Sequence, residues 1–226
     1  QIYGDILLKQ NKINEANYFI NKGLKVSQPF DSYYLLKSQS LIQEKKYELA
    51  EELLKKNYYR IENKGYLNYM LGKISEMGNM KVSAYENYRN SIKAGIDNSI
   101  NYYNFGIFLL KEKKIDEGIF YLYLARIIDS QKRSITPAFW MQVFNKLNPN
   151  FVLSNQIKPF TKIMYVNLKL MLSYLENTEN DINNLKMQFL NTEYKEHIIY
   201  LELKMNYIKN RGFSKNQIEF ILNNEI

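Results

Sequence analysis

The stretch YLNYMLGKISEMGNMKVSAYENY, residues 66–88, carries the pattern that decides the fold. Gly72 and Ala84 are small residues twelve positions apart, and the large Tyr88 follows four positions later. Gly78-Asn79 between them is typical of a turn. Two antiparallel helices fit this pattern, because helix backbones approach closely only where no large side chain intervenes. A residue four positions further along lies on the same helix face and fills the adjacent space.

The same pattern recurs at a spacing of 34 residues. Small residues open each copy at Gly4, Ser38, Gly72 and Gly106. A second small residue follows at Ala16, Ala50, Ala84 and Gly118. A large residue completes each copy at Ile20, Leu54, Tyr88 and Leu122. A fixed period of this length indicates a helical-repeat protein in which each unit is one helical hairpin.

This pattern resembles the tetratricopeptide repeat, whose signature has Leu-Gly on the first helix and Ala followed by an aromatic residue on the second. Leu71-Gly72, Ala84 and Tyr88 match it best, while Lys37-Ser38 and Gly118 depart from it. The resemblance covers residues 1–130, in units of about 1–30, 31–64, 65–98 and 99–130, and it implies a right-handed α-solenoid. The first unit lacks its opening residues, so we expect this chain to be a piece of a longer protein with further repeats upstream.

The resemblance also implies a binding face, because first helices line the concave groove that usually holds the ligand in this family. By register, the groove residues are Leu35, Tyr69 and Tyr103, then Gln39, Lys73 and Ile107, with Tyr66 nearby. Such an apolar and aromatic ladder suits an amphipathic helix or an apolar peptide of a protein partner. The alternative is that these residues serve packing, with the C-terminal helices folded back to fill the groove.

Some members of this family grip the C-terminal carboxylate of chaperones with Lys, Asn and Arg. Starting from the second unit, the corresponding positions hold Leu35, Gln39, Met70, Ile100 and Asn104. Starting one unit earlier they hold Gln1, Asp5, Leu36, Tyr66 and Met70. Neither set carries the clamp, so a chaperone-tail partner is disfavoured.

The 34-residue register ends after the fourth unit, but helical signals continue through residues 131–226. Thr136-Pro137 predicts a cap and a first-turn proline for a helix reaching Leu147. Residues 148–160 are predicted as a connector, with helices at about 161–176, 181–190, 194–210 and 215–223. Ser214 with Gln217 is typical of a capping box. This region is expected to form degenerate repeats or a cap on the array.

The composition offers little catalytic chemistry. The chain has no cysteine and one histidine, His197. Thiol chemistry is therefore excluded, and a histidine-based metal site or triad is disfavoured. Every glycine stands alone, so there is no phosphate-binding loop. We expect no enzyme activity and no cofactor.

The net charge is +8, from 31 Lys and Arg against 23 Asp and Glu. Basic pairs such as Lys113-Lys114 lie beside acidic residues, which favours solvated helix faces over a nucleic-acid site. No apolar run is long enough to span a membrane. The leading interpretation is a bacterial scaffold or adaptor, soluble in the cytoplasm or periplasm, in a cell-envelope or motility assembly. An RNA-binding helical repeat is the alternative.

Overall fold

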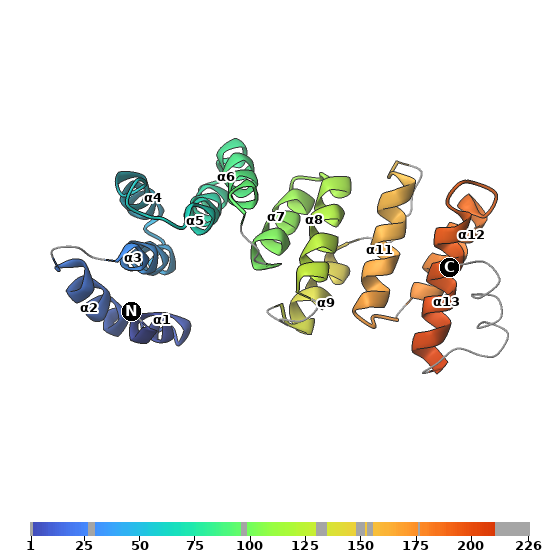
Figure 1. The fold of residues 1–226 in the computed structure, drawn as a ribbon, viewed down its shortest axis with the longest axis horizontal. Helices are drawn as coiled ribbons and strands as arrows, with labels where there is room; N and C mark the ends of the chain where they lie inside the picture. Colours follow the sequence, from blue (N-terminus) through green and yellow to red (C-terminus); the bar gives the residue numbers. More distant parts are fainter. Residues whose placement is uncertain are drawn as a thin grey trace. The chain divides into compact units, whose positions relative to one another are not determined.

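The computed structural model describes residues 2–26, 30–95, 99–129, 135–147, 152, 156–175 and 177–210. These residues form twelve α-helices and no strand, which confirms the all-α fold (Figure 1). The first helices of the four hairpins are α1 (Ile2–Lys9), α3 (Asp31–Gln43), α5 (Lys64–Met77) and α7 (Ser99–Lys111). The second helices are α2 (Ile13–Leu24), α4 (Tyr47–Lys56), α6 (Lys81–Lys93) and α8 (Ile115–Ile128). None of the described helices is both long enough and apolar enough to cross a bilayer.

The helix boundaries keep the predicted 34-residue register. The first helices end at Lys9, Gln43, Met77 and Lys111, and the second helices begin at Ile13, Tyr47, Lys81 and Ile115. Both series advance by 34 residues at every step. The sequence period is therefore also a period of the backbone.

Each hairpin turn repeats the same backbone geometry. The residue two positions after the first helix is left-handed in all four turns, with φ of 56° to 61° at Asn11, Lys45, Asn79 and Lys113. In the third turn, Asn79 N donates to Glu76 O at 3.0 Å and Met80 N donates to Ser75 O at 2.8 Å. The other three turns have the equivalent pair of bonds. This is the Schellman motif, which satisfies the last carbonyl groups of a helix and reverses the chain.

The small residues lie where the two helices of a hairpin cross, as the sequence predicts. Ala84 is fully buried. A Cβ atom on Gly72 would lie 2.9 Å from Tyr88 Cδ1, and one on Gly106 would lie 2.8 Å from Leu122 Cγ. No real Cβ atom sits that close to a neighbour, so each glycine makes room for the large residue of its own hairpin.

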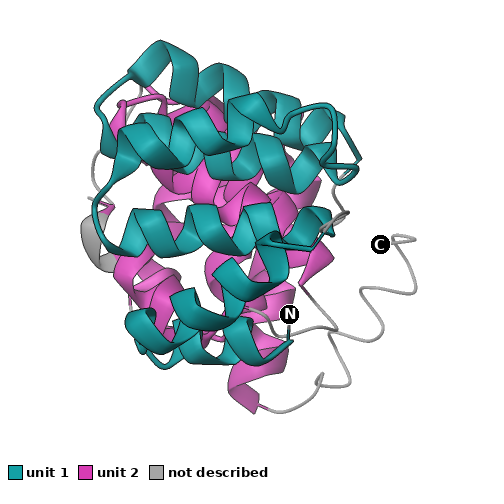
Figure 2. Ribbon diagram, turned by 90° about the vertical axis from the view of Figure 1, so that its left-hand side faces the viewer, with its two compact units in different colours: residues 1–97 teal, residues 98–226 magenta. Residues whose placement is uncertain are grey.

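The chain divides into two compact units, Gln1–Asp97 and Asn98–Ile226 (Figure 2). In unit 1, α3 packs on α1 and α2, and α5 packs on α3 and α4. Helices α3 and α5 thus each lie against both helices of the preceding hairpin. The apolar interior of the first hairpin contains Ala16, Ile20 and, from the next hairpin, Leu36.

Unit 2 joins the fourth hairpin to the C-terminal helices in one core. These helices are α9 (Pro137–Lys146), α11 (Pro159–Met171), α12 (Thr178–Phe189) and α13 (Lys195–Asn210). Helix α11 packs on α8, α12 and α13. The sequence placed four helices in residues 131–210, and their bounds agree within a few residues. Pro159 starts α11 instead of ending the connector, and the predicted helix at 215–223 and its capping box lie outside the described residues.

The turn between α11 and α12 opens with the same Schellman motif as the four hairpin turns. Ser173 is left-handed with φ 53°, Ser173 N donates to Leu170 O at 3.0 Å, and Tyr174 N donates to Lys169 O at 2.9 Å. The second helix starts three residues later than in the repeats, because Asn177 adds another left-handed residue before α12. Helices α11 and α12 therefore form a hairpin that begins like the repeats and then departs from them.

Candidate functional site

The predicted ladder in unit 1 consists of Leu35 and Gln39 on α3 and of Tyr66, Tyr69 and Lys73 on α5. Leu35 and Tyr69 are buried, whereas Gln39, Tyr66 and Lys73 are partly exposed. Asn63 positions the start of α5, because its side chain accepts a hydrogen bond from Tyr66 N at 2.9 Å. The ladder in unit 1 is thus a floor of buried side chains bordered by three accessible ones.

An aromatic cluster surrounds the α5 part of the ladder. The ring centroids of Tyr66 and Tyr69 lie 5.7 Å apart, and those of Tyr69 and Tyr88 lie 6.2 Å apart. The Tyr88 hydroxyl donates to Glu76 Oε2 at 2.7 Å. Lys73 Nζ lies 5.8 Å from the centroid of the Tyr69 ring, within reach of a cation–π interaction.

The surroundings of this cluster change the protonation equilibria of its polar groups. Burial raises the pKa of the Tyr66 hydroxyl, and the negative charge of Asp5 on α1 raises it further. Burial lowers the pKa of the Lys73 ammonium, and Glu76 opposes that shift. Burial also raises the pKa of Tyr88, with the help of Glu76. Tyr66 therefore offers a neutral hydroxyl, and Lys73 offers an incompletely hydrated cation, next to an apolar floor.

The ladder residue Tyr103, in unit 2, is covered by a helix of the C-terminal region. Helix α9 packs over Tyr103, whose hydroxyl donates to Phe139 O at 3.0 Å and whose ring centroid lies 5.2 Å from that of Trp140. Burial raises the pKa of Tyr103 to about 12. Ile107 is partly buried and packs on the same core. These contacts are those that the packing alternative expects at Tyr103.

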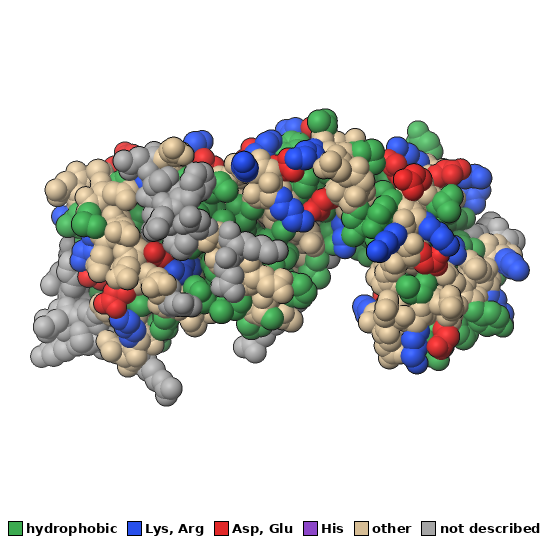
Figure 3. Space-filling model, turned by 180° about the vertical axis from the view of Figure 1, so that it is seen from behind, with side chains coloured by type: hydrophobic (Ala, Val, Ile, Leu, Met, Phe, Trp, Pro, Cys, Tyr) green, Lys and Arg blue, Asp and Glu red, His purple; other side chains and the backbone are tan. Residues whose placement is uncertain are grey.

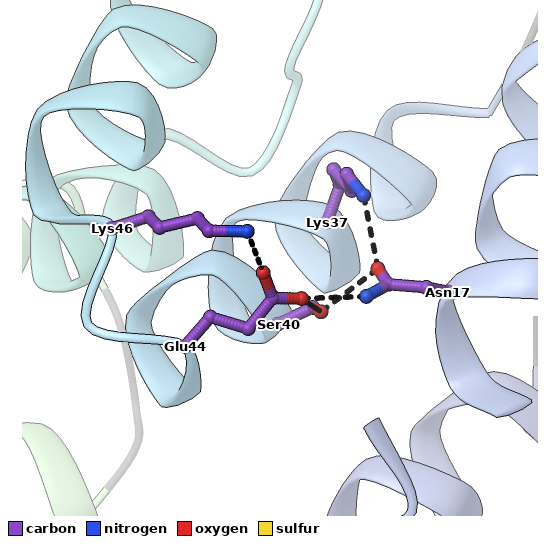
Figure 4. A network of polar contacts seen from close by, with 5 residues as sticks. All are labelled: Asn17, Lys37, Ser40, Glu44 and Lys46. Carbon is purple, nitrogen blue, oxygen red and sulfur yellow. Dashed lines mark hydrogen bonds and ion pairs between the residues drawn. The ribbon is translucent and has the colours of Figure 1, made fainter. Parts of the chain in front are cut away.

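A polar network that the sequence did not point to joins α2 to α3 (Figure 4). Asn17 is at its centre, since its Oδ1 accepts from Lys37 Nζ at 2.9 Å and from Ser40 Oγ at 2.8 Å. Asn17 Nδ2 donates to Glu44 Oε1 at 2.7 Å, and Lys46 pairs with the other oxygen of Glu44.

The 34-residue register could have revealed this network. The next unit has Leu71 and Ile74, both buried, at the positions of Lys37 and Ser40. At these two register positions, the contact between the first two hairpins is therefore polar, whereas the second and third hairpins have apolar residues there. Hydrogen bonds from Lys46 and Asn17 lower the pKa of Glu44. Burial is the main cause that lowers the pKa of Lys37.

Unit 2 also contains a hollow of about 430 Å³ between α8, α9 and the end of α11. Its polar lining fastens these segments to one another. Arg126 Nη2 donates to Met171 O at 3.1 Å, and Asp129 accepts from Ser99 Oγ and from Ile135 N, both at 3.1 Å. These bonds give the polar groups a structural role.

His197 is exposed on α13 and lies near two aromatic rings. Its ring centroid is 6.4 Å from that of Tyr194 and 6.5 Å from that of Phe160. In the part of the chain that the structure describes, no three histidine or acidic side chains gather in the manner of metal ligands. The arrangement around His197 is one of ring packing.

The chain matches no protein-family profile and no curated protein.

Proposed function

We propose that this chain is a tetratricopeptide-type repeat module that binds a segment of another protein and carries out no chemistry of its own. The observation that carries the proposal is the repetition of one hairpin, with one turn geometry and one small-to-large contact, at 34-residue intervals. Stacked hairpins of this kind present a row of equivalent positions to a partner. That architecture suits extended recognition better than it suits a catalytic pocket.

We place the partner on the face that α3 and α5 share in unit 1. Tyr66 and Lys73 are partly exposed, and Leu35 and Tyr69 form the apolar floor beside them. Tyrosine is a frequent interface anchor, because it offers a large ring with few rotamers to lose. An amphipathic helix would lay its apolar side on Tyr66 and place an acidic or carbonyl group near Lys73.

The proposal is tested by capturing the partner with the natural full-length protein and measuring its affinity for variants. Tyr66→Ala should weaken binding by about five- to thirtyfold, a loss of about 1–2 kcal/mol that is typical of an interface anchor. The melting temperature should fall less than in Tyr69→Ala, because Tyr66 is partly exposed whereas Tyr69 is buried. Tyr59→Ala is the matched control, since that tyrosine is also in unit 1 and is 94% exposed.

Tyr69→Ala separates binding from packing. We expect it to lower the melting temperature, because the ring is buried between Tyr66 and Tyr88. If Tyr66→Ala and Tyr59→Ala bind the partner equally well, the partner does not use this face.

A further inference from the structure

A group of hydrogen-bond donors spans three helices of unit 2, where α11 packs on both α8 and α13. Asn167 of α11 is at its centre, between Tyr123 of α8 and Lys204 of α13. Lys204 Nζ donates to Asn167 Oδ1 at 2.7 Å, and Asn167 Nδ2 donates to the Tyr123 hydroxyl oxygen at 3.0 Å. All three side chains are partly exposed, so a solute can reach them.

The directions of these bonds follow from the chemistry of lysine. An ammonium group only donates, so Lys204 faces the amide oxygen of Asn167. The amide nitrogen then faces Tyr123, whose oxygen accepts the bond. The hydroxyl hydrogen of Tyr123 is left over, and no group in the described part of the chain accepts it. Lys204 likewise keeps N–H groups beyond the one that Asn167 accepts.

Arg126 adds a second cation, one turn of α8 after Tyr123. Its Nη2 donates to Met171 O at 3.1 Å, and Met171 lies one turn of α11 after Asn167. The two cations are thus anchored on successive turns of α11, about 5–6 Å apart along its axis. Arg126 Nε is buried, and the described residues give it no acceptor. We refer to Tyr123, Arg126, Asn167 and Lys204 as the donor cluster.

The donor cluster has no carboxylate to balance its charge. Within the described ranges, neither Arg126 nor Lys204 forms an ion pair. The carboxylates closest along the chain are engaged elsewhere, Asp129 with the groups given above and Glu202 with Lys186. Burial lowers the pKa of the Lys204 ammonium, and the positive charge of Arg126 lowers it further. An anion between the two cations would relieve this repulsion and accept the remaining N–H and O–H groups.

We propose that the donor cluster binds a phosphate monoester. Such a group carries a charge of about −1.5 to −2 at neutral pH and has three strongly accepting oxygens, which matches two cations and a hydroxyl donor. A carboxylate carries a single charge on two oxygens. Arg126 and Lys204 contact the phosphate oxygens, Tyr123 donates its hydroxyl hydrogen, and Asn167 holds Lys204 and Tyr123 in place. The site belongs to unit 2 and the proposed partner-binding face to unit 1, so the two proposals are tested separately.

Isothermal titration calorimetry of the wild-type protein tests the choice of ligand without any substitution. The probes are O-phosphoserine, glucose 6-phosphate and acetate, all at the same ionic strength. We expect both phosphate esters to bind at least about tenfold more tightly than acetate, because the second charge engages the second cation. The tighter of the two esters shows whether the phosphate comes on a modified side chain or on a small metabolite.

Lys204→Met and Arg126→Met locate the site. Each variant removes one cation but keeps a long side chain, and each should weaken O-phosphoserine binding by about tenfold or more. Lys209→Met is the matched control, because Lys209 is also on α13 but pairs with Glu179. It should bind like the wild type, and a cooperative melt without ligand shows that each variant is folded.

Two results would overturn the proposal. Acetate that binds the wild type as tightly as both esters would show that the cluster does not select a phosphate. Unchanged O-phosphoserine affinity in folded Lys204→Met and Arg126→Met would show that the phosphate binds elsewhere and that these donors only fasten helices together.

Discussion

At the scale of single residues, each hairpin is closed by a contact between a small side chain and a large one. Gly72 admits Tyr88, and Gly106 admits Leu122, at distances that leave no space for a methyl group. Ala84, on the second helix of the same hairpin as Gly72, has no exposed surface. These contacts were predictable from the sequence, because small residues twelve positions apart have a direct steric meaning in two crossing helices.

Ala84→Leu tests the crossing contact. We expect the variant to lose about 1–3 kcal/mol of unfolding free energy, because a larger side chain in a filled core forces its neighbours out of their preferred rotamers. Urea denaturation measures the loss. Val82→Leu, on the exposed side of the same helix, should leave stability almost unchanged. Equal stability of the two variants would mean that α5 and α6 do not cross at Ala84.

Tyr103 illustrates a residue whose role the sequence left open. Its position in the register is compatible with a groove residue or with a packing residue. The contacts with α9 distinguish the two roles. Nothing in the repeat period indicates where α9 folds, because α9 lies outside the period. The contacts with Phe139 and Trp140 connect residues 36 and 37 positions apart, beyond the reach of local pattern.

We expect Tyr103→Ala to lower the stability of unit 2 by about 3–5 kcal/mol, the usual cost of deleting a buried aromatic ring. Tyr103→Phe should cost about 1 kcal/mol, the worth of its hydrogen bond to Phe139 O. Thermal denaturation followed by the fluorescence of Trp140 gives both values. If Tyr103→Ala has the same melting temperature as the wild type, the Tyr103 ring is a groove residue and has no packing role.

At the scale of elements, the geometry of the hairpin turn persists further along the chain than the pattern of small and large side chains. The turn of α11 and α12 opens with the same two hydrogen bonds as the turns of the four hairpins. The two small residues that indicate those hairpins are absent from it, whereas Leu185 keeps the large apolar residue of the second helix. Val166 occupies the position of Gly106, counted back from the left-handed residue, and Asp181 occupies the position of Ala84, counted from the start of the second helix. The pattern of small and large residues therefore detects hairpins only up to residue 130. Helices from Pro137 onward were still predictable from capping residues and apolar spacing.

A buried ion pair joins the two helices of the α11–α12 hairpin. Lys169 Nζ lies 2.5 Å from Asp181 Oδ2, and both side chains are almost fully buried. The rings of Tyr165 and Tyr174 lie 5.7 and 5.4 Å from the same nitrogen. Burial raises the pKa of Asp181 despite the opposing effect of Lys169. The pair thus holds two helices together in a site that disfavours an isolated charge.

Asp181→Leu should destabilise unit 2 by about 3–5 kcal/mol, because it leaves the Lys169 ammonium buried without its counter-charge. The double variant Lys169→Met with Asp181→Leu should recover most of that loss, since well-packed apolar residues replace such pairs at little cost. A double-mutant cycle in urea gives the coupling energy. If the double variant is no more stable than Asp181→Leu, the ion pair is not what holds α11 to α12.

At the scale of the whole molecule, the net charge of +8 comes from 31 Lys and Arg against 23 Asp and Glu. On the face shown in Figure 3, Lys and Arg side chains alternate with Asp and Glu, and no continuous basic surface stands out. The boundary between the two compact units, Asp97 to Asn98, coincides with the end of the third sequence unit, and the fourth hairpin shares its core with the C-terminal helices. The sequence had grouped that hairpin with the array, because the period counts residues and carries no information about which helices share a core.

The dispersed charge allows a test of the RNA-binding alternative. We expect fluorescence anisotropy with a single-stranded RNA to show weak binding in about 50 mM salt and its loss by about 200 mM, as counterion release requires. Scrambled RNA of the same length should bind equally. Tight binding at the higher salt concentration with a preference for one sequence would replace the protein-binding proposal.

The joint between α2 and α3 combines an apolar contact, Leu36 against Ala16 and Ile20, with the polar network around Asn17. The hydrogen bonds of this network are half-exposed, whereas Leu71 and Ile74, at the register positions of Lys37 and Ser40 in the next unit, are buried. We therefore expect the amide protons of α2 to exchange with solvent through a local opening, well before those of α6. Because the folded-state pKa of Glu44 is lowered, its contribution is present above the ordinary carboxyl pKa and is lost as the pH falls through the lowered value. Hydrogen-exchange mass spectrometry compares the exchange rate of α2 in the wild type and in Glu44→Gln. We expect α2 to exchange more slowly in the wild type at neutral pH, and the two rates to become equal in acid, where the first hairpin detaches from a core that stays folded.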